Sequence, residues 1–142
     1  MVKLLSVFID NKPGRLKTVT GLLNEKKINI RALTLQDIKE YGILKVIVDR
    51  PDDAYLSISE KGFACALKET LAVKVADKPG GLDELLKVFS DSGINIKDSF
   101  GFVVESKKSA ILCIEVDNLA AAEELLKKSK LSVLDEEDLY NL

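Results

Sequence analysis

The sequence predicts an α+β protein in which one β-α-β-β-α-β unit occurs twice in tandem, and three observations lead to this prediction. Residues 12–16 (Lys-Pro-Gly-Arg-Leu) return as residues 78–82 (Lys-Pro-Gly-Gly-Leu). Residues 28–30 (Ile-Asn-Ile) return as residues 94–96 at the same spacing of 66 residues, since 78 − 12 equals 94 − 28. Strand-like apolar runs also alternate with segments of helical periodicity in the same order in both copies. A fixed internal spacing indicates a duplicated structural unit.

Each copy opens with a strand and a helix. Residues 4–9 and 71–76 are short apolar runs rich in strand formers, and each ends at a polar loop. A Pro-Gly pair then opens a helix, because the fixed φ of proline suits the first helical turn and its missing N–H costs nothing there. The apolar residues that follow have helical spacing and predict a buried face, formed by Leu16, Val19 or Thr20, and Leu23 in the first helix, and by Leu82, Leu85, Leu86 and Phe89 in the second.

The remaining elements also follow the same order in both copies. The Ile-Asn-Ile segment starts a strand that runs to about Ile38 or Glu105, and a polar turn leads into a third strand, which predicts a hairpin. Second helices begin near Pro51 and Asn118. Last strands are predicted at residues 63–67 and 131–134. This order is that of the ferredoxin-like split βαβ motif, an antiparallel sheet with its helices on one face.

The boundary between the copies falls near residues 68–70, so the predicted units are residues 1–68 and 69–142. No Pro-, Gly- or Ser-rich linker separates them, which favours close docking of the two copies. The acidic run at residues 135–138 is expected to be a solvated end of the chain.

The first copy carries more apolar residues than one buried sheet face needs. Residues 4–9 and 43–48 are apolar on both faces, broken mainly by Ser6 and Lys45. A strand with one solvated face should alternate apolar and polar residues. We therefore expect the second face to be buried against the other copy or against another chain, as an assembly interface, with a homodimer as the expected state.

Composition excludes several classes of function. Lys and Arg number 21 against 23 Asp and Glu, so a net charge of -2 gives no general attraction for nucleic acid or an anionic membrane. The apolar start of the chain is too short for a membrane span or a signal peptide, and a cytoplasmic protein is expected. The chain has no histidine, which removes the commonest general base and a major zinc ligand. Cys65 and Cys113 lie in apolar stretches and are expected in the core. We expect no enzyme activity, no catalytic residue, no metal and no cofactor.

The Pro-Gly turns are the candidate binding site. Each would bring free N–H groups of a helix N-terminus to the end of a strand, where a carboxylate or phosphate is favoured. Gly14 and Gly80 would let a ligand approach the main chain closely. The amides of Asn29 and Asn95 could accept from an ammonium, so the pair of features suits a zwitterion. The alternative is that the glycines shape the helix entry and that the asparagines cap or turn the chain.

These segments resemble the signature of ACT domains, in which an Asp/Asn-x-Pro-Gly loop precedes an Asn-Ile strand start, and the resemblance covers essentially the whole chain as two units. It implies a βαββαβ regulatory module that pairs with a like module and binds an amino acid between the loop of one unit and the second-strand start of its neighbour. The ligand-binding residues that it implies are Asn11, Lys12, Pro13, Gly14, Arg15, Leu16, Asn29, Ile30, Asp77, Lys78, Pro79, Gly80, Gly81, Leu82, Asn95 and Ile96.

Two departures from the ACT pattern bear on the ligand. Some amino-acid-binding members carry a polar side chain just before the loop, where this chain has Ile9 and Val75. The copies also differ at Arg15 and Gly81, so that one site alone is competent or the two differ in preference. ACT units are usually fused to the enzyme that they control, and no length remains for a catalytic domain. The resemblance thus implies allosteric action in trans on a metabolic enzyme, or action through oligomerisation.

Three rival hypotheses stand beside a ligand-binding regulator. Residues 99–103 are similar to part of the RNP1 stretch of RNA-binding RRM domains, but Asp98 and Ser99 replace a basic residue and glycine there. Phe100 and Phe102 also share the alternation of the core-like Ile94 and Ile96. An enzyme of ferredoxin-like fold would depend on carboxylates and lysines alone. A structural adaptor whose loops bind nothing is the third hypothesis.

Overall fold

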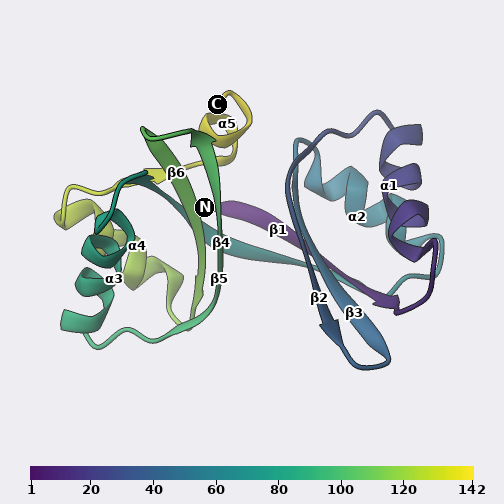
Figure 1. Cartoon of the computed structure of the whole chain (residues 1–142), viewed down its shortest axis with the longest axis horizontal. Coiled ribbons are helices and arrows are strands. Elements are labelled where there is room, and N and C mark those ends of the chain that lie inside the picture. Colours follow the sequence, from purple (N-terminus) through teal and green to yellow (C-terminus); the bar gives the residue numbers. More distant parts are fainter. The chain divides into compact units, whose positions relative to one another are not determined.

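The computed structural model describes all 142 residues and divides into two compact units. The first unit is Lys3–Lys68, and the second is Glu69–Leu142 together with Met1–Val2 (Figure 1). The first unit contains β1 (Val2–Asp10) from Lys3 onward, α1 (Arg15–Glu25), β2 (Ile30–Ile38), β3 (Tyr41–Val48), α2 (Pro51–Ser59) and the start of β4 (Cys65–Ala76). The second contains the rest of β4, α3 (Gly81–Asp91), β5 (Ile96–Glu105), β6 (Ser109–Val116), α4 (Leu119–Lys128), β7 (Ser132–Leu134) and α5 (Glu136–Tyr140).

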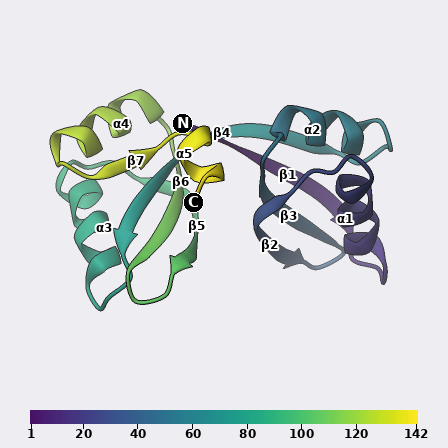
Figure 2. The ribbon, with the colours of Figure 1, turned by 90° about the horizontal axis from the view of Figure 1, so that it is seen from above.

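Each unit is an antiparallel sheet with two helices on one face, which confirms the predicted ferredoxin-like order (Figures 1 and 2). In the first unit β3 lies between β1 and β2, and the N–H of Phe8 donates to Ala64 O (2.8 Å), just before β4. In the second unit β6 lies between β4 and β5, and β7 pairs with the other edge of β4.

The predicted last strand of the first copy and first strand of the second are one continuous strand, β4. No glycine or proline interrupts the extended backbone at residues 68–70, so nothing forces a turn there. Met1 and Val2 group with the second unit: Thr70 Oγ1 donates to Val2 O (3.2 Å), and Met1 packs against the second core. The limits 1–68 and 69–142 stay a prediction.

Each unit has a hydrophobic core of its own. The first contains Val19 and Leu23 of α1 packed on alternate residues of β1 and β3, and the second contains Leu85 and Phe89 of α3 packed on β4 and β6. The prediction that Leu82 and Leu86 are also core residues is wrong, because they are 46% and 36% exposed. Successive helical residues are rotated by about 100°, so Leu86 lies on the flank of the buried stripe. Leu82 is on the same side of the helix as Phe89, but it lies in the first turn of α3, where it lines a cavity.

A β-bulge in β5 overturns one further expectation. Ile96 pairs with Val116, but Asp98 pairs with Glu115, so one extra residue shifts the alternation of the strand. Phe100 and Phe102 therefore lie on the sheet face away from the helices, not on the face of Ile96, and their half-buried rings stack with centroids 6.4 Å apart. This removes one argument against RNA binding, while the unfavourable charge of the segment remains.

The starts of α1 and α3 differ from the predictions. Pro13 and Pro79 lie outside the helices, because Gly14 and Gly80, both with φ of 85°, are the N-cap residues. This left-handed conformation suits glycine, which has no Cβ, and it cannot continue a helix. The acidic run near the C-terminus forms the start of α5, with a capping box between Asp135 and Asp138 and with Leu139 buried, while Asp135, Glu137 and Asp138 are exposed as expected.

The left-handed residue after the first helix of each unit supports a stability prediction. Lys27 has φ of 55°, whereas its repeat equivalent Gly93 has φ of 67°. We expect Lys27→Gly to raise the free energy of unfolding by about 0.5 kcal/mol, since relief of left-handed strain outweighs the added freedom of the unfolded chain. Urea unfolding measures the change. Lys26→Gly is the matched control: Lys26 has φ of -86°, so there is no left-handed strain to relieve and this variant should lower the free energy of unfolding. Equal losses in both variants would contradict the prediction.

Candidate functional site

The Pro-Gly turns have the same pattern of main-chain hydrogen bonds in both units. In the first unit the N–H of Lys12 donates to Asp10 O (2.8 Å), and the N–H of Arg15 donates to Lys12 O (3.3 Å). The second unit repeats both bonds at 3.0 Å between the equivalent residues. The repeat seen in the sequence is therefore also a repeat of hydrogen bonding, with a longer second bond in the turn that carries Arg15.

Asn11 and Asp77, two predicted ligand-binding residues, fasten these turns to the neighbouring hairpins. Asn11 Nδ2 donates to Asp37 Oδ1 (3.1 Å) and to Lys39 O (3.3 Å). Asp77 Oδ2 accepts from the N–H of Lys107 (2.6 Å). Both side chains therefore hold the turn against the loop between the second and third strands of its unit. Only the side-chain atoms that are not used in these hydrogen bonds could contact a ligand.

The starts of α1 and α3 leave N–H groups available. Neither helix has a side chain that caps it, and the first helical bonds run from Thr18 to Gly14 O and from Glu84 to Gly80 O (3.0 Å each). The N–H groups of Arg15 and Gly81 are used within the turns, whereas the next two N–H groups of each helix have no acceptor within the helix. The helix dipole makes this end attractive to an anion. The two ends differ in charge, since α3 carries Asp83 and Glu84 in its first turn and α1 carries no acidic residue there.

A cavity lies beside each turn, between the helix start and the ends of the second and third strands. The first-unit cavity has a volume of about 70 Å³, and the second-unit cavity has a volume of about 340 Å³. Besides the predicted turn residues, the linings include positions that the sequence analysis missed: Leu35, Asp37 and Gly42 in the first unit, and Gly101, Val103 and Ala110 in the second. The repeat alignment holds the signal that could have found them, because each set follows the other at the repeat spacing.

A further cavity of about 530 Å³ flanks the first turn. Arg15 and Asp10, whose side chains form an ion pair (Nη2 to Oδ2, 3.2 Å), line both this cavity and the smaller one. The exposed aromatic rings of Phe8 and Tyr41, with centroids 6.2 Å apart, form part of its wall. Arg15 is therefore already paired with a carboxylate, which weakens its expected attraction for an anionic ligand.

No unit by itself brings its Pro-Gly turn to its own Asn-Ile segment. In the first unit β2 begins at Ile30 and ends at Ile38, which pairs with Tyr41. Tyr41 also pairs with Asp10, the last strand residue before the turn. Asn29 therefore lies at the opposite end of the sheet from the turn of its own unit, and the equivalent pairing puts Asn95 in the same position in the second unit. The predicted union of turn and asparagine thus requires a neighbouring unit.

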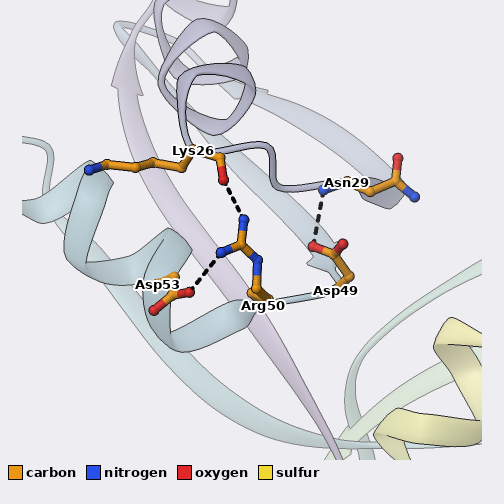
Figure 3. A network of polar contacts seen from close by, with 5 residues as sticks. All are labelled: Lys26, Asn29, Asp49, Arg50 and Asp53. Carbon is orange, nitrogen blue, oxygen red and sulfur yellow. Dashed lines mark hydrogen bonds and ion pairs between the residues drawn. The ribbon is translucent and has the colours of Figure 1, made fainter.

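The main chain of Asn29, not its side chain, is held by its surroundings (Figure 3). Its N–H donates to Asp49 Oδ1 (3.0 Å), and its carbonyl accepts from the N–H of Asp49 (3.2 Å). Arg50 next to it binds Asp53 and the carbonyl of Lys26. The side-chain amide of Asn29 points away from this network and is exposed, so the alternative in which it caps or turns the chain gains no support.

The cysteines lie in or beside the cores. Cys113 is 2% exposed, and burial raises the pKa of its thiol to about 12. Burial also raises the pKa of the half-buried Cys65, so neither thiol has the low pKa that activates a nucleophile. The side chains form no group of three or more His, Cys, Asp or Glu that could hold a metal ion. None of the helices has the length and hydropathy required to cross a membrane.

Comparison with known proteins adds family and fold. The model of a family described as "ACT domain pair" matches residues 1–142. No curated protein sequence matches the chain. The crystal structure of protein BT0572 from Bacteroides thetaiotaomicron is similar with a TM-score of 0.92 and 33% identity, over 99% of this chain and 96% of that chain.

Two more distant structures are regulatory subunits of aspartate kinase. The ligand-free form from Thermus thermophilus has a TM-score of 0.66 at 16% identity, over 89% of this chain and 91% of that one. The subunit from Thermus flavus has a TM-score of 0.61 at 14% identity, over 90% and 92%. At this identity the likeness shows a shared fold.

Proposed function

The chain belongs to the family of ACT domain pairs, and from this premise we propose that it is a regulatory protein, not an enzyme, that binds an amino acid or a similar zwitterion. The observation that carries the proposal is the same in both units: an uncapped helix start, an N-cap glycine and a cavity lie side by side. A built cavity at a helix N-terminus offers both a place for a ligand and a partner for its carboxylate.

In the proposed site the ligand carboxylate meets the free N–H groups at the start of α1 or α3, and its side chain enters the adjacent cavity. The residues proposed to contact it are those of the two turns, 11–16 and 77–82. Asn29 or Asn95 of a neighbouring unit, with the following isoleucine, completes the site by accepting from the ammonium group. The exposed amide of Asn29 is available for this role. The neighbour is a second unit of the same chain or of a homodimer.

Signalling follows if ligand affinity differs between two arrangements of the paired units. We propose that the partner so controlled is a metabolic enzyme in the cytoplasm, regulated in trans. The regulatory subunits of aspartate kinase provide a precedent for this fold in a control subunit. The competing hypothesis is an adaptor that binds no small molecule, and one observation favours it: the side chains of Asn11 and Asp77 are already used to fasten the turns.

A thermal unfolding screen of the protein against the twenty amino acids tests the proposal. At least one is expected to raise the midpoint, since a ligand that binds only the folded state stabilises it by about 2.7 kcal/mol at a hundred times its Kd. Asn29→Ala and Asn95→Ala should each weaken a hit about tenfold, which corresponds to about 1.4 kcal/mol.

The matched control for the asparagine variants is Asn24→Ala. Asn24 is exposed on α1 and is not among the residues proposed to contact the ligand, so its replacement should leave affinity unchanged. Absence of any midpoint shift with all twenty amino acids would favour the adaptor. Full affinity in both Asn29→Ala and Asn95→Ala would show that the asparagines are not part of the site.

A further inference from the structure

We propose that the two Pro-Gly cavities serve unequal ligands, and that the second unit alone receives the apolar side chain of a neutral amino acid. This inference rests on the proposed function and names the class of ligand that the second site binds. The cavities occupy equivalent places in the repeat, since Ile9, Leu16 and Asn11 line one where Val75, Leu82 and Asp77 line the other. Their volumes nevertheless differ, about 70 Å³ against about 340 Å³. The cause must lie in the residues that differ between the copies.

The first difference is Leu35 in β2 against Gly101 in β5. A β-carbon built on Gly42 would lie 3.1 Å from Leu35 Cδ1, so the leucine side chain covers Gly42 and fills the space beside the turn. Gly101 has no side chain to fill the equivalent space. A β-carbon there would lie 3.5 Å from Leu112 Cδ1 and 3.3 Å from the carbonyl of Ile111, so the walls are close and a larger side chain would occupy the cavity.

The second difference is one of polarity. Asp37, bonded to Asn11, lines the first cavity, whereas the aliphatic Val103 takes its place in the second. Leu82 and Val103 stand at the second cavity with 46% and 57% of their surface exposed. A ligand with an apolar side chain would remove this surface from water, which is favourable, whereas a polar side chain would lose its own hydration there.

Charge narrows the ligand class further. Lys78 lines the second cavity, and α3 directs its uncapped N–H groups to the same end, so one carboxylate has partners there. Asp83 and Glu84 in the first turn of α3 would repel a second negative charge on the ligand side chain. The volume of the second-unit cavity lies in the range of small-molecule sites, whereas that of its repeat equivalent in the first unit, lined by Leu35 and Asp37, lies below this range. The chemistry fits a neutral amino acid with a branched or aromatic side chain.

Calorimetric titration with L-leucine and L-phenylalanine, against glycine and L-aspartate, tests the inference. The two apolar amino acids should bind at least tenfold more tightly than glycine, and L-aspartate should bind more weakly than either. Gly101→Leu should reduce the affinity for L-leucine at least tenfold, because it restores the side chain that closes the first cavity.

Two further variants keep the test decisive. Val103→Asp gives the second cavity the acidic residue of the first and should weaken L-leucine binding even if Gly101→Leu does not fold. Val104→Ala, at an exposed residue of β5 that does not line the cavity, should have no effect. Equal affinities for glycine and L-leucine, or unchanged L-leucine binding in both Gly101→Leu and Val103→Asp, would overturn the inference and leave the proposed function standing. Failure of all twenty amino acids to bind would overturn both.

Discussion

Replacing Phe89 with alanine is expected to lower the free energy of unfolding by about 3–5 kcal/mol. Phe89 is the largest of the fully buried side chains, with 1% of its surface exposed, and it joins α3 to the strands of the second core. Its removal takes away the transfer free energy of the ring and leaves a cavity that rigid strands on the other side can only partly fill. The second unit has no alternative anchor of this size on α3.

Urea unfolding, followed by circular dichroism, measures the loss. Leu86→Ala is the matched control, because Leu86 lies three residues before Phe89 on the same helix but is 36% exposed. This substitution should lower the free energy of unfolding by less than about 1 kcal/mol. Leu23 is the repeat equivalent of Phe89, and Leu23→Ala should destabilise the first unit by about 2–5 kcal/mol. If Phe89→Ala cost no more than Leu86→Ala, α3 would not be packed on the sheet as described.

Gly81→Ala is expected to cost about 3 kcal/mol, at the upper end of what overpacking usually costs. A β-carbon on Gly81 would lie 2.1 Å from the carbonyl oxygen of Ala76, which also accepts from the N–H of Lys78. The obstacle is main chain, so the turn or the helix start must move by roughly an ångström. Arg15 holds the equivalent position in the first unit, where the turn must leave room for its β-carbon.

Gly21→Ala is the control for this substitution. Gly21 lies inside α1, and the nearest atom to a β-carbon there is Lys17 Nζ at 3.9 Å, so the same chemical change should stabilise the protein by about 0.5–1 kcal/mol. Urea midpoints of the two variants should therefore move in opposite directions. A loss below about 1 kcal/mol for Gly81→Ala would mean that the second turn readily adopts the geometry of the first.

The sequence by itself determined the duplicated unit, the order of its elements and the placing of the turns. Each of these depends on information local to a segment: the spacing of Leu85 and Phe89 on one helix, the apolar runs of the strands, and the Pro-Gly pairs that precede the helices. Local signals were less reliable at helix starts, where Gly14 and Gly80, not the prolines, set the N-caps because the backbone there is left-handed.

Only the tertiary structure decided which side chains surround the turns and on which face of the sheet the residues of β5 lie. Leu35 and Gly101 reach the cavities through strand pairing with residues distant in sequence, and a single bulge in β5 moves Phe100 and Phe102 to the face away from the helices. Side chains alternate between the two faces of a strand, so one extra residue moves the side chains that follow it to the opposite face of the sheet. Neither composition nor helical periodicity reveals such an extra residue. Cavity volume is likewise a property of side chains that meet across the fold, which is why two copies with one motif differ in the space they enclose.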